Sequence, residues 1–245
     1  MPQYSETPIR RRRYLASVGA VLGSVGVAGC GGSPDDEDSD STPTIEPSAE
    51  VVESEVFTAP FFPDGGGSEV PWVGLEVRNP TETPHRQINV ESRLRAEDDS
   101  VLEVVERFAV ALPPETTWHY YHQFDETIDA SEIAEVENTV TKQETGILGE
   151  VIEDAEVLNS SMSFDGSSVS ITGEVDIGDV EASRVTILAY IYDAEGQFRG
   201  AITDVEIDPS GTDTIAFDSG SVGYRTPPSD PDPDDYQLRI ISGSV

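Results

Sequence analysis

Short alternating runs separated by turn residues constrain the fold of this 245-residue chain more than any other feature. The runs are rich in β-branched and aromatic residues, and Pro, Gly and Asp stand between them. In the run 104–110, for example, the side chains of Val104, Glu106, Phe108 and Val110 are predicted to point one way and the others back. The pattern predicts an all-β protein. We expect strands at 51–58, 70–78, 87–96, 101–110, 116–124, 151–159, 167–177, 184–193, 197–205, 212–218 and 235–241.

One segment, residues 129–142, is ambiguous. Residues 129–132 have the sequence of a helix capping box, and hydrophobic residues follow at helical spacing. The segment also matches residues 230–241, an acidic loop that leads into a strand. Helix and strand both stay open here, and the match favours a loop with a short turn, followed by a strand.

The β-rich region consists of two halves that align with each other. Residues 89–101 match residues 186–198 without a gap, and after one inserted residue the turn at 112–116 meets the turn at 208–212. This indicates an internal duplication with a unit of about 100 residues, the usual size of an immunoglobulin-like sandwich. We therefore predict two tandem immunoglobulin-like β-sandwich modules, at 48–144 and 145–245.

The strongest turn signal lies in the second module, between residues 192 and 198. Asp193 is placed to accept backbone hydrogen bonds, and Gly196 is placed to adopt the positive φ that reverses the chain. We expect a β-hairpin around this turn.

The hairpin spanning residues 188–200 resembles that of the FxLYD family of extracytoplasmic β-sandwich domains. Ile191-Tyr192-Asp193 fits the central triplet of the family, whereas Ala189 stands where the family has Phe. The resemblance covers residues 150–241, and in the first module Leu94 alone matches the triplet. It implies a fold and an extracellular setting, and it brings no catalytic residues.

The first 30 residues have the layout of an export signal. A basic cluster at 10–13 precedes an uncharged run at 15–29 that is short and rich in glycine, which argues against a permanent membrane span. The cluster resembles the twin-arginine export motif, with an arginine pair followed by an aromatic residue. We predict a signal peptide at 1–29, whose export motif consists of Arg11, Arg12, Tyr14 and Leu15.

The segment Val27-Ala28-Gly29-Cys30 resembles a lipobox, the cleavage site that leaves a cysteine for lipid attachment. Small residues such as Ala28 and Gly29 fit a narrow peptidase site, and the Cys30 thiol forms the thioether to lipid. Residues 30–47 are then predicted to be a lipidated cysteine followed by a disordered acidic tether, since Gly, Ser, Thr, Pro and acid cannot bury apolar surface. A calcium site in the tether is the lesser alternative, because the glycine and distal glutamate of an EF-hand loop are missing.

The net charge of -34 comes with a single lysine, Lys142. This combination resembles the secreted proteins of halophilic archaea, because concentrated salt shortens the Debye length to roughly 3 Å and makes such self-repulsion tolerable. An ordinary acidic domain is the alternative. The negative field repels nucleic acid, and one cysteine excludes both an internal disulfide and a Cys-based zinc site.

Catalytic motifs are missing from the sequence: it has no nucleophile elbow, no phosphate-binding glycine loop and no zinc-protease motif. His119 and His122 lie in one expected strand, and their odd and even positions put them on opposite faces, which argues against a shared metal. We expect no enzymatic activity, no cofactor and no metal site.

We therefore expect a non-enzymatic binding or envelope-structure module, held by the lipid of Cys30 on the outer face of the cell membrane, with a protein or small-molecule partner at the cell surface. Phe61 and Phe62, before a glycine-rich turn, are the candidate partner contact. The alternative is a solute-capturing component of a membrane transporter, which should have a pocket lined by aromatic residues such as Trp72 and Trp118.

Overall fold

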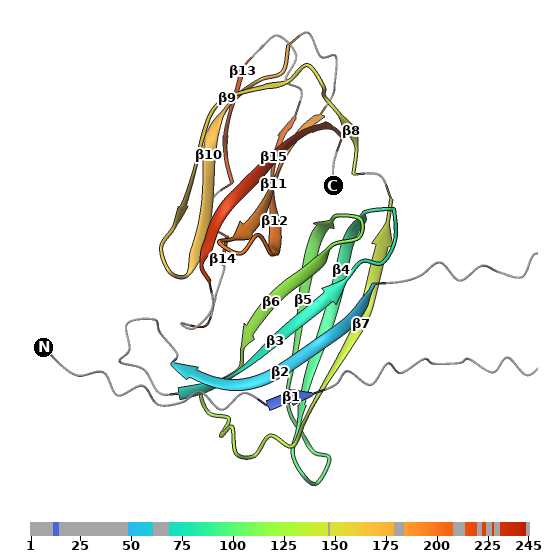
Figure 1. The fold of residues 1–245 in the computed structure, drawn as a ribbon, viewed down its shortest axis with the longest axis vertical. Helices are drawn as coiled ribbons and strands as arrows, with labels where there is room; N and C mark the ends of the chain where they lie inside the picture. The colour runs from blue at the N-terminus through green and yellow to red at the C-terminus, as the bar shows by residue number, and fades with distance from the viewer. Residues whose placement is uncertain are drawn as a thin grey trace, which may run out of the picture.

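The computed structural model describes residues 12–14, 49–60, 69–146, 148–178, 184–207, 214–219, 222–223, 227 and 231–243. Every regular element within these ranges is a β-strand, and none of them is a helix (Figure 1). The prediction of an all-β protein is confirmed.

Six strands form the first half of the fold, and they belong to two sheets. β2, β3 and β6 are neighbours in one sheet, and β5, β4 and β7 form the other. Alternate residues of the central strand β4, among them Ile88, Val90 and Leu94, are buried, so one face of this sheet covers the core. The strands are β2 (Glu50–Pro60), β3 (Glu69–Arg78), β4 (His85–Arg95), β5 (Val101–Leu112), β6 (Thr117–Gln123) and β7 (Glu135–Thr145), and a short β1 (Arg12–Tyr14) pairs with β2.

The second half repeats this arrangement. β12, β11, β15 and β8 are neighbours in one sheet, and β10 lies between β9 and β13 in the other, with β14 at its end. The strands are β8 (Glu150–Val151), β9 (Glu156–Phe164), β10 (Ser168–Asp176), β11 (Arg184–Asp193), β12 (Phe198–Ile207), β13 (Thr214–Asp218), β14 (Val222–Gly223) and β15 (Pro233–Ser242).

The same pairing pattern therefore occurs twice. β4 lies between its hairpin partner β5 and the last strand β7, just as β11 lies between β12 and β15. β3 lies between β2 and β6, just as β10 lies between β9 and β13. Even the bulge coincides: the hairpin register shifts between Leu94 and Arg95 in the first half and between Ile191 and Tyr192 in the second, which are aligned positions.

The two hairpin turns have the same backbone geometry. In the first, Ala96 N donates to Ser100 O (2.9 Å) and Asp99 N donates to Ala96 O (3.1 Å). Asp99 has a φ of 63°, which its short polar side chain tolerates. The chain reverses here at the position aligned with the glycine of the second turn.

In the second turn, Asp193 N donates to Gln197 O (3.1 Å) and Gly196 N donates to Asp193 O (2.9 Å). Gly196 has a φ of 78°, as predicted. Asp193 Oδ1 accepts the backbone N–H groups of Glu195 and Gln197, each at 2.9 Å, also as predicted. This carboxylate holds the turn together from within.

A glycine facing an aromatic ring is a further repeated feature. Gly74 on β3 pairs with Tyr121 on β6, and Gly173 on β10 pairs with Phe217 on β13. A Cβ at Gly74 would lie 2.9 Å from the Tyr121 ring, and one at Gly173 would lie 2.8 Å from the Phe217 ring. Each glycine therefore leaves the space into which its cross-strand ring folds.

The halves meet through a continuous sheet. Phe198 of β12 pairs in parallel with Trp118 of β6, and this joins the strands in the order β1-β2-β3-β6-β12-β11-β15-β8. In Figure 1 the second half lies above the first, and β12 lies over the upper end of β6. The connection between the halves runs from β7 to β8 near residue 148.

The central strand β11 is buried on both faces. Ile187, Ala189 and Ile191 point into the core of the second half, whereas Leu188 and Tyr190 belong to a cluster shared with the first half. An alternating strand normally buries one face. β11 reads as a continuous hydrophobic run because the end of the first half covers its other face.

The chain differs from the sequence expectation at residues 151–159 and adopts one of the two alternatives at residues 129–142. The run 151–159 is not one strand: β8 ends at Val151, a turn follows at 153–154, and β9 begins at Glu156. Acidic residues at the turn break the run there. In the ambiguous segment, Asp129 Oδ1 accepts Ser131 N (2.8 Å) in a turn, and β7 follows, so the segment is a loop and then a strand.

Candidate functional site

The predicted N-terminal site residues fall outside the part of the chain whose side chains are described. Arg12 and Tyr14 contribute backbone only, as members of β1. The predicted partner contact and tether also lie outside the described residues. The residues concerned are Arg11, Leu15, Val27, Ala28, Gly29 and Cys30 of the signal and lipobox, residues 31–47 of the tether, and Phe61 and Phe62.

Strand β6 carries the histidines and aromatic residues that the sequence brought to notice. His122 and Phe124 pack edge to face (ring centroids 5.0 Å apart), and both side chains are buried. His119 lies on the other face with Nδ1 3.6 Å from Glu76 Oε1, and burial lowers the pKa of its imidazole. Within the described residues, no three His, Cys, Asp or Glu side chains are grouped closely enough to hold a metal ion.

The two tryptophans are core residues. Trp118 packs in the cluster shared by the halves, and Trp72 packs with Phe57 and Val70 in a small cluster of its own. Neither lines either of the two hollows described below. Both rings fill space between strands.

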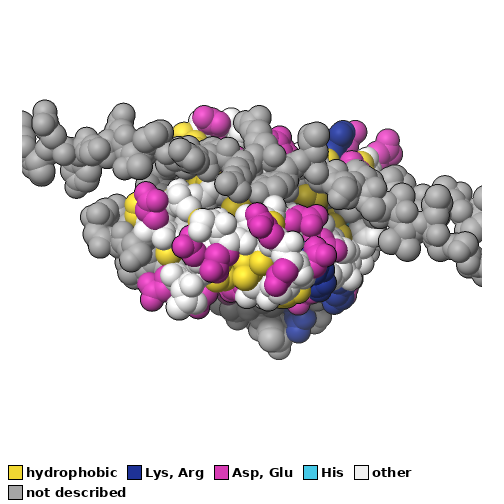
Figure 2. All heavy atoms as spheres, turned by 90° about the horizontal axis from the view of Figure 1, so that it is seen from below, with side chains coloured by type: hydrophobic (Ala, Val, Ile, Leu, Met, Phe, Trp, Pro, Cys, Tyr) yellow, Lys and Arg dark blue, Asp and Glu magenta, His cyan; other side chains and the backbone are white. Residues whose placement is uncertain are grey.

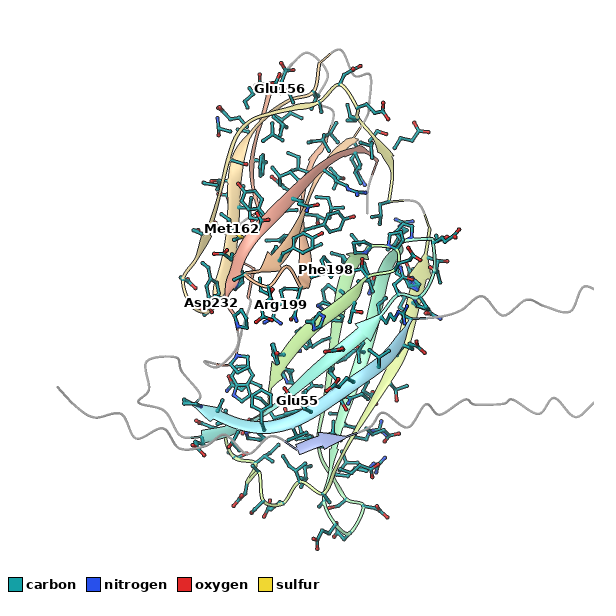
Figure 3. The ribbon with its side chains drawn as sticks, viewed as in Figure 1. Glu55, Glu156, Met162, Phe198, Arg199 and Asp232 are labelled. Carbon is teal, nitrogen blue, oxygen red and sulfur yellow. The ribbon has the colours of Figure 1, made fainter. Side chains whose placement is uncertain are left out.

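A buried ion pair lies at the second hairpin, where the two halves meet. Arg199 Nε lies 3.6 Å from Asp193 Oδ2, and Arg199 Nη2 donates to Pro231 O at 3.3 Å. The guanidinium carbon stands 4.8 Å from the centroid of the Tyr121 ring, and Trp118 Nε1 donates to Arg199 O at 3.0 Å. Both charged side chains are almost completely buried. Figure 3 places Arg199 and its neighbour Phe198 where the two halves meet.

The Arg199 guanidinium of this pair links the two halves. A buried cation is tolerated where a carboxylate and an aromatic face compensate for lost water. Here the carboxylate belongs to the second half and the ring to the first, so the guanidinium bridges them. The Tyr121 ring can lie there because its cross-strand partner is Gly74. This contact restrains how the halves are placed relative to each other.

A cleft of about 240 Å³ lies between the halves and is a candidate site. Its walls are mostly apolar, and they come from loops of the first half, from the connection between the halves, and from the outer face of β11 and β15. The lining residues include Pro84, Pro114, Leu148, Leu188, Tyr190 and Arg239.

Two polar side chains stand in this apolar cleft. Tyr190 is 2% exposed and lines the cleft, and its hydroxyl forms no hydrogen bond with a described residue. Burial raises the pKa of Tyr190, so the group stays a neutral hydroxyl. The guanidinium carbon of Arg239 stands 5.4 Å from the centroid of the Tyr190 ring. Arg239 is exposed, and no carboxylate of the described residues forms an ion pair with it.

A second hollow, of about 420 Å³, is open and polar and lies beside β5 and β6. It is lined by charged side chains of both signs, namely Glu103, Glu106, Arg107 and Asp125. The neighbouring outer face of β5 exposes Phe108 to 63%. As predicted, Phe108 shares the outward direction of Val104 and Glu106.

The sequence did not identify Tyr190 or Arg239 as site residues. The usable signal was the unbroken hydrophobic run of β11, which a strand with one solvent face would not show.

Within the described residues no helix is long and apolar enough to cross a membrane. No protein-family model, curated protein or solved structure matches the chain.

Proposed function

We propose that this protein is exported by the twin-arginine pathway and held on the outer face of the cell membrane by a lipid on Cys30. The observation that carries the proposal is the order of segments: an arginine pair, an uncharged run, the lipobox and an acidic stretch precede a β fold that begins at Glu50. Cleavage before Cys30 removes β1 and leaves β2 as an edge strand. The acidic stretch then spaces the fold from the membrane.

We further propose that the fold consists of two tandem immunoglobulin-like sandwiches of FxLYD type that arose by duplication. The repeated strand pairing, the aligned bulges, the two matching turns and the two glycine–aromatic pairs support this. Independent origin would not place such details at aligned positions. Modules of this kind present surfaces and loops for binding, or serve as structure in the cell envelope.

High-salt adaptation is part of the proposal. Figure 2 shows Asp and Glu side chains spread over the face seen from below, with few Lys and Arg side chains among them. A charge distributed in this way supports a role in hydration and solubility in brine rather than in binding one cationic partner.

A solute-capturing component of a transporter is the second candidate. The cleft between the halves favours it, since it is apolar, is held by both halves, and contains an unpaired guanidinium and an unpartnered hydroxyl within the described chain. In that role the protein binds a small solute close to the membrane and passes it on.

Replacement of Cys30 by Ser tests the anchoring. In a halophilic archaeal host, we expect the Cys30→Ser variant to appear in the medium, because without the thiol no thioether to lipid forms. The measurement is the distribution of the protein between membrane and medium, together with the mass of the mature N-terminus. Ser33→Ala is the matched control and should stay at the membrane. Retention of Cys30→Ser at the membrane would contradict the proposal.

A further inference from the structure

The cleft between the halves combines three properties that together define a ligand class. It is apolar along most of its wall, it is lined by one cationic side chain, and it is lined by one tyrosine whose hydroxyl forms no hydrogen bond with a described residue. We propose that it binds a small monocarboxylate with an apolar body, whose carboxylate contacts the Arg239 guanidinium and the Tyr190 hydroxyl. This extends the proposed function of a binding module by naming the ligand class of one site.

The cation is the first argument. In a chain with 48 acidic and 14 basic residues, an arginine beside a cleft is expected to have a carboxylate partner. The partly exposed Arg93 and Arg95 do: Arg95 Nη2, for example, lies 3.0 Å from Glu137 Oε2. Arg239 instead lies over the Tyr190 ring, and its ion-pairing capacity is unused within the described residues. A carboxylate ligand would use it, since guanidinium and carboxylate form paired hydrogen bonds.

The Tyr190 hydroxyl is the second argument. Tyr190 lines the apolar cleft, where a hydroxyl gains most from a hydrogen bond when the acceptor belongs to a ligand that displaces water. The Tyr190 ring is buried and packs on Phe198 with 6.0 Å between the ring centroids. An acceptor oxygen in the cleft would satisfy the hydroxyl. A carboxylate offers that acceptor and the charge for Arg239 in one group.

Size and wall chemistry define the rest of the ligand. A volume of about 240 Å³ is below the range of roughly 300–1,000 Å³ that holds drug-sized ligands. Pro84, Pro114, Leu148 and Leu188 offer no hydrogen-bonding side chain, so the remainder of the ligand is apolar. No Asp or Glu lines the cleft in the described chain, which removes the ligands that a metal cation needs.

The negative charge of the protein does not prevent this binding in brine. The Debye length is roughly 3 Å at 1 M salt, so a carboxylate in contact with Arg239 experiences that guanidinium and little of the distant acidic surface. At low salt the same surface opposes the ligand.

The test uses the purified full-length protein and benzoate, followed by calorimetric and NMR titration at the lowest salt that leaves the circular dichroism spectrum unchanged. Benzoate should bind, and two matched probes should bind more weakly by about tenfold or more: benzyl alcohol, which lacks the charge, and acetate, which lacks the apolar ring.

Three variants locate the site. Arg239→Gln should weaken benzoate binding by about tenfold or more, and Tyr190→Phe, which keeps the ring, by roughly three- to tenfold. Arg184→Gln changes an exposed arginine of the same sheet that does not line the cleft, and it should bind like the parent. Unchanged thermal unfolding of each variant shows that the fold persists.

Three results would overturn the proposal: no saturable benzoate binding, benzyl alcohol binding as tightly as benzoate, or equal effects of Arg239→Gln and Arg184→Gln. None of them bears on membrane anchoring, which the Cys30→Ser experiment decides separately.

Discussion

The two hairpins of this protein share one backbone geometry and differ in the chemistry of their side chains. The turns after β4 and β11 have the same hydrogen bonds and a left-handed residue at the same position. The first turn projects into solvent, and the aligned positions Ala96 and Leu102 carry no charge. The second lies at the junction, where Asp193 and Arg199 form a buried pair. The backbone pattern is the same in both hairpins, and the side chains differ where another part of the molecule covers them.

The central strands differ for the same reason. β4 buries alternate residues, and its other face stays partly open. β11 buries nearly every residue, since its outer face meets the first half. A strand at the junction therefore acquires the hydrophobic composition of a doubly covered strand, although its place in the pairing pattern is that of β4.

The largest expected effect comes from removing the buried cation. Arg199→Ala leaves the Asp193 carboxylate without its partner in a buried site, and breaking such a pair costs about 3–5 kcal/mol of unfolding free energy. The first-half comparison is Arg95→Ala, which removes a partly exposed pair with Glu137 and should cost less than about 1 kcal/mol. Denaturant unfolding at constant salt measures both. Equal losses would mean that the junction pair is no more than a surface contact.

Substitutions in the glycine–aromatic pairs should also cost different amounts of stability in the two halves, with a smaller difference than that between the arginine variants. Gly173→Ala places a Cβ against both the Phe217 ring and the carbonyl oxygen of Asn159, and backbone cannot move aside easily. We expect a loss of about 1–3 kcal/mol for Gly173→Ala, and a smaller loss for Gly74→Ala, whose contacts are with side chains. Thermal unfolding of the two variants in parallel gives the order, and the reverse order would contradict this account of the packing.

Acid should act mainly on the first half, which contains all three histidines. His85 is fully buried, neither ring nitrogen has a hydrogen-bond partner in the described chain, and burial lowers the pKa of its imidazole below the ordinary 6.5. The unfolded chain therefore binds a proton near 6.5 while the folded chain does not. Stability from this group is present above that pH and declines as the pH falls below it.

The measurement is the free energy of unfolding between about pH 7 and 5, above the range in which carboxylates titrate. His85→Phe should reduce the slope, because the ring stays and the titrating group goes. His119 contributes in the same direction, since burial also lowers its pKa, so part of the slope should persist in the variant. An unchanged slope in His85→Phe would show that His85 is not the group that couples folding to protons.

Much of the fold followed from local patterns. Alternation predicted most strands to within a few residues, and the gapless match of residues 89–101 with 186–198 located two hairpins whose bulges coincide. Asp193 and Gly196 predicted their turn because a carboxylate acceptor and a positive φ are local requirements. The prediction of a single strand at 151–159 was wrong, because this β-like stretch crosses a turn.

The sequence by itself determined the strand-rich class, the turns and the predicted export address, because each depends on neighbours along the chain. The tertiary structure decided that Trp72 and Trp118 fill cores, that Arg199 connects the halves, and that Tyr190 and Arg239 share a cleft. The pattern of hydrophobic residues along a strand shows that a face of the strand is covered, but it does not show which part of the molecule covers that face. Such contacts arise only when strands distant in the sequence pair: Trp118 and Arg199, for example, with a separation of 81, are brought together by the pairing of β6 with β12.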